Sequence, residues 1–298
     1  MRRQLPRAAL AACLALSLLA APSPCGPRAP RIQRDASLDQ DRLRQILRSV
    51  AEYCEKVKRM ALFYICVEKM ADKEYFFSDV TRDSGLLREE RIFEVSRVAH
   101  LTYTYDYQLI KKGADIQEDR TLLEENGKKK NEKHVALKQT KYSAQLTIFG
   151  PVGFLSAYWQ RHFNYSVIGE DRVGDVQALV IRAVPNEERE DNYQIGRVWI
   201  GPDSQVLRVE IEPASLEDYT DEILTSRLGD FHKRLTWTID YSVEKNGVRF
   251  PGRQTIREEF VRTTPSGVEQ KTLKRETVFD YLDYKFFVVE TDVEFNKK

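Results

Sequence analysis

Residues 195–213 constrain this chain more than any other stretch, because they read as a β-hairpin with two different faces. Four turn-forming residues, Gly201-Pro202-Asp203-Ser204, stand between segments in which apolar and polar residues alternate. If Gly201 pairs with Ser204, one face carries Val198, Ile200, Leu207, Val209 and Ile211. The opposite face then carries Arg197, Trp199, Val206, Arg208 and Glu210. Such a hairpin is typical of an antiparallel sheet that covers a core on one side only.

The same alternation recurs through most of the chain. In residues 101–109 it places on one face Leu101, Tyr103, Tyr105, Tyr107 and Leu109. In residues 235–243 it places on one face Leu235, Trp237, Ile239, Tyr241 and Val243. Asn126-Gly127 and Asn246-Gly247 are strong signals for tight turns. We therefore expect a mainly β protein of the α+β class, with roughly ten or eleven strands joined mostly by hairpins.

Residues 38–60 predict one long amphipathic helix before these strands. Ser37 is a suitable N-cap residue. Apolar residues then recur at three- and four-residue spacing, in the stripe Leu43, Ile46, Leu47, Val50, Tyr53, Cys54 and Val57. A helix of this kind can pack on a sheet, and it also has the right shape to cover a concave sheet as a plug.

The N-terminal residues 1–25 read as a secretory signal peptide. A short basic segment precedes an apolar run at residues 8–21, and a Pro-rich stretch follows. We expect residues 26–36 to be a flexible Pro-rich segment and residues 37–298 to form a single domain. The apolar run is too short to span a bilayer as a stable helix. The mature chain is therefore expected to be exported to the periplasm without a transmembrane span.

Two further features bear on location and partners. Leu10-Ala11-Ala12-Cys13 has the letters of a lipidation site, but too few apolar residues precede Cys13, so we expect a freely soluble rather than a lipid-anchored protein. The chain has 47 basic and 46 acidic residues. A nucleic-acid-binding surface requires a net basic balance, so no nucleic-acid partner is expected.

Cys54 and Cys66 are the two cysteines that lie well beyond the signal peptide. An exported protein meets an oxidising compartment, which favours a disulfide between them. The bridge would tie the end of the predicted helix to the next element. The alternative is a pair of buried free thiols. Neither cysteine has a histidine at ligand spacing, so no metal site is expected here.

Residues 150–163 interrupt the strand rhythm. Four apolar side chains group there at helical spacing, namely Phe154, Leu155, Tyr158 and Trp159. An apolar insertion between strands can act as a lid over a ligand, and it can equally be a helix of the core. The sequence leaves both interpretations open.

No catalytic motif is present in the sequence. The four histidines, His100, His134, His162 and His232, form no metal-binding motif, and the chain has no Gly-x-Ser-x-Gly sequence and no phosphate-binding loop. Adjacent acidic pairs such as Glu258-Glu259 point to opposite faces of a strand. We therefore expect no enzyme activity, no metal and no cofactor.

A family resemblance adds to this interpretation. The strand pair at residues 167–185 and 196–213, with a Trp-containing strand, an acidic turn and a returning strand, resembles the LolA/LolB-like lipoprotein-carrier superfamily. Residues 246–260 and 278–295 are similar to the ends of secreted bacterial proteins grouped with it. The resemblance implies a curved antiparallel sheet, or unclosed β-barrel, with helices over its concave face. It also implies an acyl chain carried in the concavity.

Two functions of different class follow. The first is binding of an acyl chain or other apolar ligand by hydrophobic sequestration, with no cofactor. We expect its hydrophobic wall to consist of Val198, Ile200, Leu207, Val209, Ile211, Trp237, Ile239 and Tyr241. The alternative is a protein-interaction or envelope-sensor module of the same fold, which would bind an envelope protein and carry no lipid.

Overall fold

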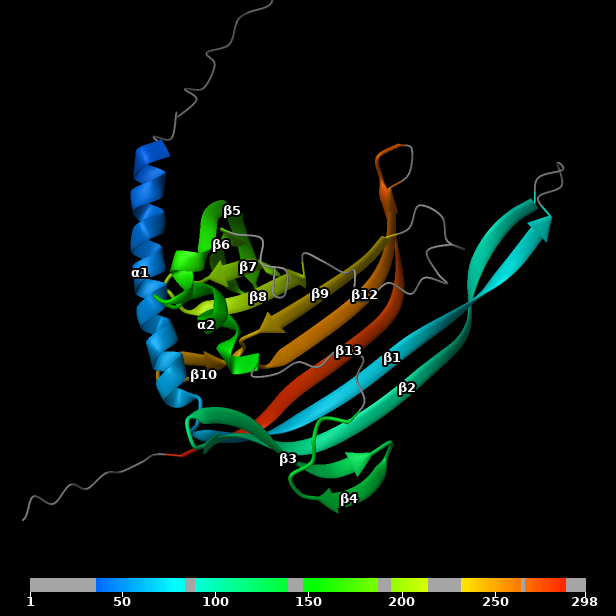
Figure 1. Ribbon diagram of the computed structural model, residues 1–298, viewed down its shortest axis with the longest axis horizontal. Helices are drawn as coiled ribbons and strands as arrows, with labels where there is room; N and C mark the ends of the chain where they lie inside the picture. Colours follow the sequence, from blue (N-terminus) through cyan, green and yellow to red (C-terminus); the bar gives the residue numbers. More distant parts are fainter. Residues whose placement is uncertain are drawn as a thin grey trace, which may run out of the picture.

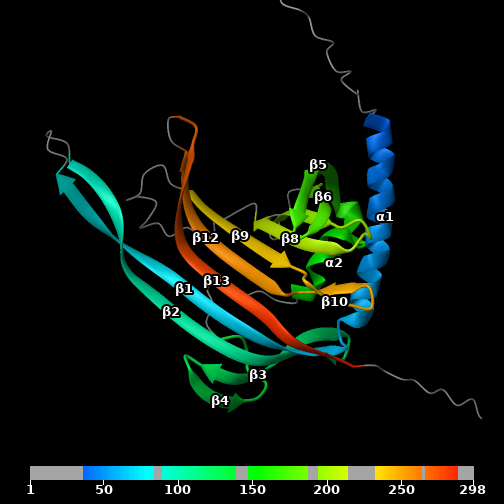
Figure 2. The ribbon, with the colours of Figure 1, turned by 180° about the vertical axis from the view of Figure 1, so that it is seen from behind.

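The structure is a computed structural model, and it describes residues 36–83, 89–138, 147–186, 194–213, 232–263 and 266–287. The expected signal peptide lies outside these residues. Four helical segments are described: α1 (Ala36–Met60), η1 (Thr147–Phe149), α2 (Gly150–Leu155) and η2 (Trp159–His162). They lie on one side of a large curved sheet (Figure 1), and the other side of the sheet is seen from behind in Figure 2.

Eleven antiparallel strands form that sheet, in the order β4-β3-β2-β1-β13-β12-β9-β8-β7-β6-β5. Their bounds are β1 Tyr64–Asp83, β2 Glu89–Lys112, β3 Asp115–Glu125, β4 Lys128–Glu132, β5 Phe163–Val173, β6 Val176–Pro185, β7 Gln194–Ile200, β8 Val206–Pro213, β9 His232–Asp240, β12 Arg253–Thr263 and β13 Glu269–Phe286. A separate small hairpin is made by β10 (Val243–Lys245) and β11 (Val248–Phe250). Within the described residues β4 and β5 form two unjoined edges. The predicted fold class, a curved and unclosed antiparallel sheet with a long N-terminal helix and short helices over its concave face, is confirmed.

The concave face of the sheet is built from the residues that the alternation predicts. Tyr103 pairs with Met70, and Met70 pairs with Phe279 on the neighbouring strand. Tyr103, Tyr105 and Tyr107 are 6%, 0% and 2% exposed. The tyrosine stripe therefore belongs to the core, where aromatic side chains fill the wide space between strands and covering segments.

The apolar stripe of α1 is buried along only part of its length. Val50 and Val57 are 0% and 1% exposed, whereas Leu43 and Ile46 are half-buried. The buried half packs on α2 and on the β10–β11 hairpin, where Tyr53 Oη accepts a hydrogen bond of 3.2 Å from a backbone N–H of β11. The stripe therefore continues, toward the N-terminus, past the core that covers its C-terminal half.

The predicted disulfide is not formed, because Cys54 and Cys66 are both free thiols buried in the core. Cys54 Sγ lies 3.6 Å from the Pro151 carbonyl oxygen, to which it donates, while Cys66 interacts with Tyr284 on β13. The turn after α1 thus leads the two sulfur atoms to different neighbours. Burial raises the pKa of Cys54 to about 12 and also raises the pKa of Cys66, so both remain protonated thiols.

A single glycine of β7 lets α2 approach the sheet. A Cβ atom at Gly196 would lie 2.7 Å from Cε1 of Phe154, closer than the two atoms can come. The ring of Phe154 therefore rests directly on the backbone of β7. The Tyr165 hydroxyl donates to the Phe154 carbonyl oxygen and holds the end of α2 from β5.

We predict that Gly196→Val destabilises the protein by about 1–3 kcal/mol, because the new side chain must displace Phe154 from a packed position. Valine is favoured in strands, so strand propensity alone would predict that Gly196→Val stabilises the protein. Urea unfolding of the purified protein would measure the change.

Gly153→Ala is the matched control. An added Cβ at Gly153 meets no heavy atom within 4 Å, and alanine improves helix propensity by about 0.5–1 kcal/mol. Equal losses in the two variants would contradict the close packing of Phe154 on Gly196.

Candidate functional site

The hairpin of β7 and β8 contains a β-bulge that changes which residues share a face. Trp199 pairs with Arg208 and Ile200 pairs with Val206, so Leu207 is an extra residue on β8. Val206 packs in the main core, whereas Leu207 packs with Trp199 in a separate cluster. The prediction that Leu207 shares a face with the wall residues is wrong, and Val206 takes its place.

The turn explains this shift. The Gly201 backbone N–H donates to the Gln205 carbonyl oxygen at 2.9 Å, and the Ser204 N–H donates back to Gly201 at 3.0 Å. The turn therefore extends one residue beyond Ser204, and Ser204 takes a left-handed backbone conformation with φ of 63°. A four-residue turn was the assumption behind the predicted register, and the additional residue appears as the bulge.

The other predicted wall residues lie on the concave face. Five of them, with exposed fractions from 0% to 7%, belong to the main core: Val198, Ile200, Val209, Ile211 and Ile239. Tyr241 is buried too, and its hydroxyl donates to the Thr147 carbonyl oxygen at 2.8 Å. Trp237 packs against this core half-buried, and its buried indole N–H has no hydrogen-bond partner among the described residues. Gly150 lies against Ile239 and Tyr241, so this part of the wall is covered by α2.

The four lid candidates do not share one surface. Phe154 and Leu155 are 4% and 0% exposed and belong to the main core. Tyr158 and Trp159 are 56% and 38% exposed and face outward. The segment is thus a core helix at its start and a surface feature at its end.

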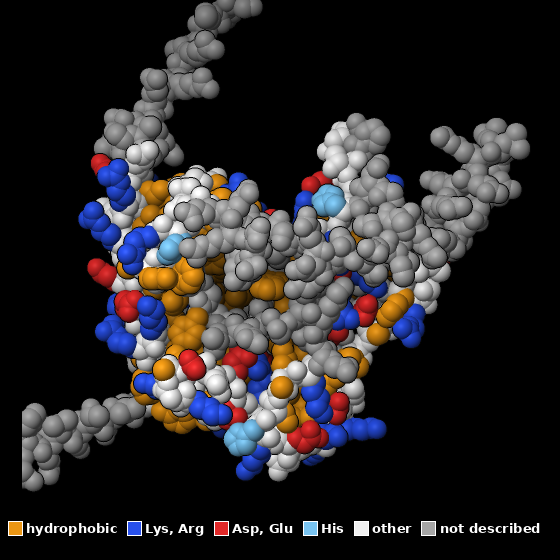
Figure 3. All heavy atoms as spheres, viewed as in Figure 1, with side chains coloured by type: hydrophobic (Ala, Val, Ile, Leu, Met, Phe, Trp, Pro, Cys, Tyr) orange, Lys and Arg blue, Asp and Glu red, His pale blue; other side chains and the backbone are white. Residues whose placement is uncertain are grey.

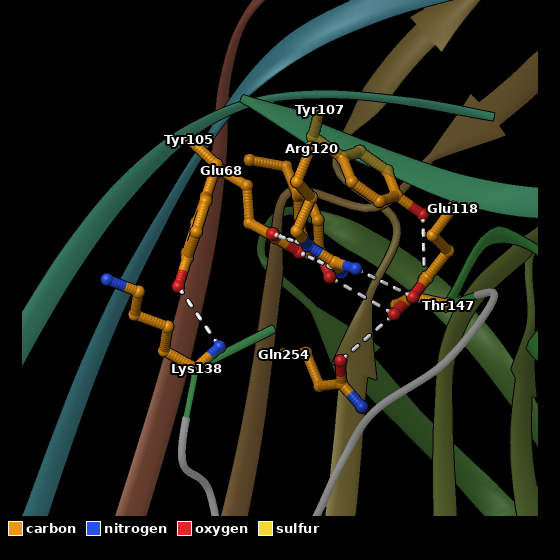
Figure 4. Close-up of polar contacts among 9 residues, drawn as sticks. Glu68, Tyr105, Tyr107, Glu118, Arg120, Lys138, Thr147 and Gln254 are labelled. Carbon is orange, nitrogen blue, oxygen red and sulfur yellow. Dashed lines mark hydrogen bonds and ion pairs between the residues drawn. The ribbon is translucent and has the colours of Figure 1, made fainter. Parts of the chain in front are cut away.

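A buried polar network occupies another part of the concave face, at β1, β2 and β3 (Figure 4). Arg120 binds the Glu68 carboxylate through two nitrogen atoms, Nε at 2.5 Å and Nη2 at 3.0 Å. Its Nη1 lies 2.9 Å from Glu118, whose other oxygen accepts a hydrogen bond of 3.0 Å from the Tyr107 hydroxyl. Glu68 is 0% exposed and Arg120 is 4% exposed. A bidentate ion pair of this kind fixes β3 relative to β1 across the intervening β2.

Polar contacts also tie η1 to the sheet. The Thr147 hydroxyl donates to Oε1 of Gln254 on β12 at 3.0 Å and lies 3.1 Å from the Tyr281 hydroxyl on β13 (Figure 4). These contacts, together with the packing of Phe154 of α2 against β7, hold the η1–α2 segment at both of its ends. The segment therefore has a defined position over the wall.

The electrostatic balance of the network depends on Arg120. Burial raises the pKa of the Glu68 carboxyl, and the bonds and charge of Arg120 oppose that rise. Burial also works against the charge of Arg120, but the hydrogen bonds and charges of Glu68 and Glu118 together outweigh this effect and raise the pKa of Arg120. Sequence reasoning missed these residues. Arg120 lies two positions before the buried Leu122, on the same face of β3, and a charged residue at a core-facing position of a strand is a signal that could have found it.

A groove of about 660 Å³ lies between the N-terminal half of α1 and the edge strand β5. From α1 it is lined by Gln40, Arg42, Leu43 and Ile46. From the sheet it is lined by Tyr165, Ser166, Val167, Ile168, Gly169, Glu170 and Leu179. Leu179 pairs with Ile200 of the predicted wall, so groove and wall are neighbours on one face. Figure 3 shows hydrophobic side chains gathered on the side of α1 that faces the sheet, with lysine and arginine side chains along its other side.

In the described ranges no three His, Cys, Asp or Glu side chains come together in a way that could hold a metal ion. His162 lies 5.5 Å from Trp159 and 5.3 Å from Tyr158, between ring centroids, in an aromatic cluster. Among the helices that the structure describes, none is long and apolar enough to cross a membrane.

Comparisons with known proteins give structural matches only. No protein-family model and no curated protein matches this chain. A LolA superfamily protein from Nitrosomonas europaea is 13% identical with a TM-score of 0.34, covering 82% of this chain and 94% of that one. A DUF1329 family protein from Desulfovibrio piger is 11% identical with a TM-score of 0.33, covering 83% and 95%. A chain in the structure of the Pseudomonas aeruginosa MucA/MucB complex is 10% identical with a TM-score of 0.22, covering 82% of this chain and 98% of that one. The first bears the superfamily name to which the sequence resemblance pointed. What this chain binds is inferred from its own residues.

We predict that Arg120→Met destabilises the protein by about 3–5 kcal/mol near neutral pH, because it leaves the Glu68 carboxylate buried without a counter-ion. In this variant the pKa of folded Glu68 lies above its unfolded value. A group of that kind favours the folded state at low pH and ceases to do so as the pH rises through its folded pKa. The loss measured by urea unfolding should therefore grow between about pH 5 and about pH 7.

Two variants serve as controls. Arg253 makes a similar cross-strand ion pair with Asp280 at 2.6 Å, but the Arg253 side chain is 57% exposed. Arg253→Met should therefore lower the stability by about 1 kcal/mol or less. The double variant Glu68→Leu, Arg120→Met should recover much of the stability, since no unpaired charge remains. A loss independent of pH in Arg120→Met would contradict the assigned charge on Glu68.

Proposed function

We propose that this protein is an exported, periplasmic and non-catalytic binding protein that takes up an acyl chain or a similar apolar ligand on the concave side of its sheet. The groove between α1 and β5 is the observation that carries the proposal. Its volume of about 660 Å³ lies within the range of small-molecule sites, roughly 300–1,000 Å³. We place the ligand in this groove because the predicted wall beside it is covered by α2.

The chemistry of the groove favours an apolar chain with a polar end. Leu43 and Ile46 present the half-buried part of the α1 stripe, and Val167 and Leu179 face them from the sheet. The charged side chains of the lining are Arg42 and Glu170, both exposed. An amphiphile could bury its hydrocarbon among the apolar side chains and leave its head group with Arg42 and water.

Burial of the chain supplies enough free energy for a carrier. Each methylene removed from water contributes about 0.8 kcal/mol, so roughly eight methylenes contribute about 6 kcal/mol before the cost of association is subtracted. The side chains that the ligand would cover are already exposed in part, so no core contact has to break. Val198, Ile200, Val209, Ile211, Trp237, Ile239 and Tyr241 would extend the site only if α2 moved.

The N-terminal sequence supports the proposed location. A basic segment, an apolar run and a Pro-rich stretch occur in the order of a secretory signal peptide. An apolar ligand cannot cross an aqueous compartment freely, and a protein that covers its hydrocarbon would carry it there.

One observation favours protein interaction as a second function. Beyond the pair Glu74–Arg275, β2 is the one strand of the described residues that pairs with β1, from Tyr75–Val98 to Asp83–Glu89, so these residues form a two-stranded arm. The arm extends away from the rest of the sheet (Figure 1 and Figure 2). A two-stranded ribbon has little stability in water on its own, and an envelope protein partner would add the missing packing.

We predict that Ile46→Glu weakens binding of a fluorescent long-chain fatty acid by about tenfold or more, because it places a carboxylate among the apolar side chains of the groove. Displacement of the probe by unlabelled fatty acid, together with native mass spectrometry for co-purified lipid, would measure binding.

Gln45→Glu is the matched control, with the same new charge on the same turn of α1 but on an exposed position. It should leave the affinity within about twofold of the unmodified protein. Absence of probe binding and of co-purified lipid in the unmodified protein would overturn the acyl-chain proposal and leave protein interaction.

A further inference from the structure

The segment that follows α2 displays aromatic side chains on the surface. In residues 157–161 all side chains except Gln160 are exposed, and Tyr158 and Trp159 are 56% and 38% exposed. The two rings meet edge to face with centroids 5.2 Å apart, and the Arg161 guanidinium lies 5.5 Å from the centroid of the Tyr158 ring. We call Tyr158, Trp159 and Arg161 the aromatic platform.

The platform is held in place from beneath. Gln160 Nε2 donates to the carbonyl oxygens of Leu47 on α1 and Leu155 on α2, both at 2.7 Å. The Asn186 side chain donates to the Arg161 carbonyl oxygen at 2.9 Å, and the Asn186 backbone N–H donates to the His162 carbonyl oxygen at 2.9 Å. Three elements thus fix a short segment whose large apolar rings point to solvent. Such an arrangement exposes apolar area with no benefit to the core.

The chemistry of the platform is that of the interface between water and a bilayer. Tyrosine and tryptophan have an apolar ring and a polar edge, and both concentrate at the level of lipid head groups. The neighbouring part of α1 is basic. Residues 40–51 contain Arg42, Arg44 and Arg48 against one acidic residue, Asp41. Cations beside a bilayer are attracted to anionic head groups by about 1 kcal/mol each.

We propose that the aromatic platform and the adjoining arginines dock this protein on the surface of an anionic bilayer, with the groove open toward the lipid. The platform leads directly into β5, whose Val167 and Ile168 line the groove and are 46% and 50% exposed. The other wall of the groove is α1, which also anchors Gln160. An acyl chain leaving the bilayer would therefore meet the groove beside the docked surface. The docking does not require the ligand, and the orientation of the groove rests on the proposed function.

Vesicle binding tests the proposal directly. The full mature chain is mixed with vesicles of phosphatidylethanolamine and phosphatidylglycerol, and the bound fraction is measured by flotation. We expect binding to these vesicles, weaker binding to pure phosphatidylcholine, and weakening by salt. Tyr158→Ser, Trp159→Ser together should reduce the partition constant by about tenfold or more. Arg161→Gln should reduce it by about fivefold.

The control removes exposed apolar surface elsewhere. Val95 and Val98 on the arm are 52% and 47% exposed, and Val95→Ser, Val98→Ser together should leave vesicle binding unchanged. The tryptophan fluorescence of the unmodified protein should be quenched by brominated lipids, and this quenching should be lost in Trp159→Phe. No binding to the anionic vesicles, or equal loss in the arm control, would overturn the proposal. A dimer of the unmodified protein that the platform variant cannot form, with no vesicle binding by either, would assign the platform to self-association and also overturn the proposal.

Fatty-acid affinity in solution separates this proposal from the previous one. Ile46→Glu should lose the fatty-acid probe and keep vesicle binding. The platform variant should lose vesicle binding and keep the probe. Loss of both activities in the platform variant would assign Tyr158 and Trp159 to the ligand site and overturn docking by the platform.

Discussion

The packing of α1 on the segment that covers the concave sheet is the contact on which the rest of this structure depends. A single sheet of eleven strands has a concave face much wider than one helix can bury. The C-terminal half of the α1 stripe closes over α2 and β11, with Val50 and Val57 almost fully buried. The N-terminal half reaches past that core and faces β5 across the groove. One continuous stripe therefore serves both as core and as the wall of a site.

The part of the concave face that none of the described helices covers contains charges in pairs. Arg275 pairs with Glu74, Lys233 lies 3.1 Å from Glu258, and Arg120 holds Glu68. A buried charge is costly without a partner, and these pairs supply one to each carboxylate. The concave face is thus apolar at β7 and β8, whereas at β1 and β3 ion pairs stand beside the buried tyrosines of β2. Under the proposed function, an apolar ligand would bind beside the apolar region.

Much of this architecture could be predicted from the sequence, and the misses have local causes. The period-two alternation gave the strands, and the three- and four-residue spacing gave the stripe of α1, because both patterns record burial on one face. Leu207 was misplaced because the turn is one residue longer than its composition suggests. The free thiols of Cys54 and Cys66 depend on the path of the chain after α1, which has no periodic signal. The groove could not be predicted, since it forms between segments more than a hundred residues apart.

The half-buried state of Leu43 and Ile46 links stability to binding. Apolar side chains left partly in water forgo part of the roughly 25 cal/mol per Å² that burial would supply, and a ligand chain that covers them recovers it. A longer core under α1 would bury these side chains permanently and close the groove. Under the proposed function, the fold gives up some stability at the N-terminal half of α1 and presents a surface that a ligand would complete. Under the proposed function, substitutions at Val50 and Val57 would act on folding, whereas substitutions at Leu43 and Ile46 would act on binding.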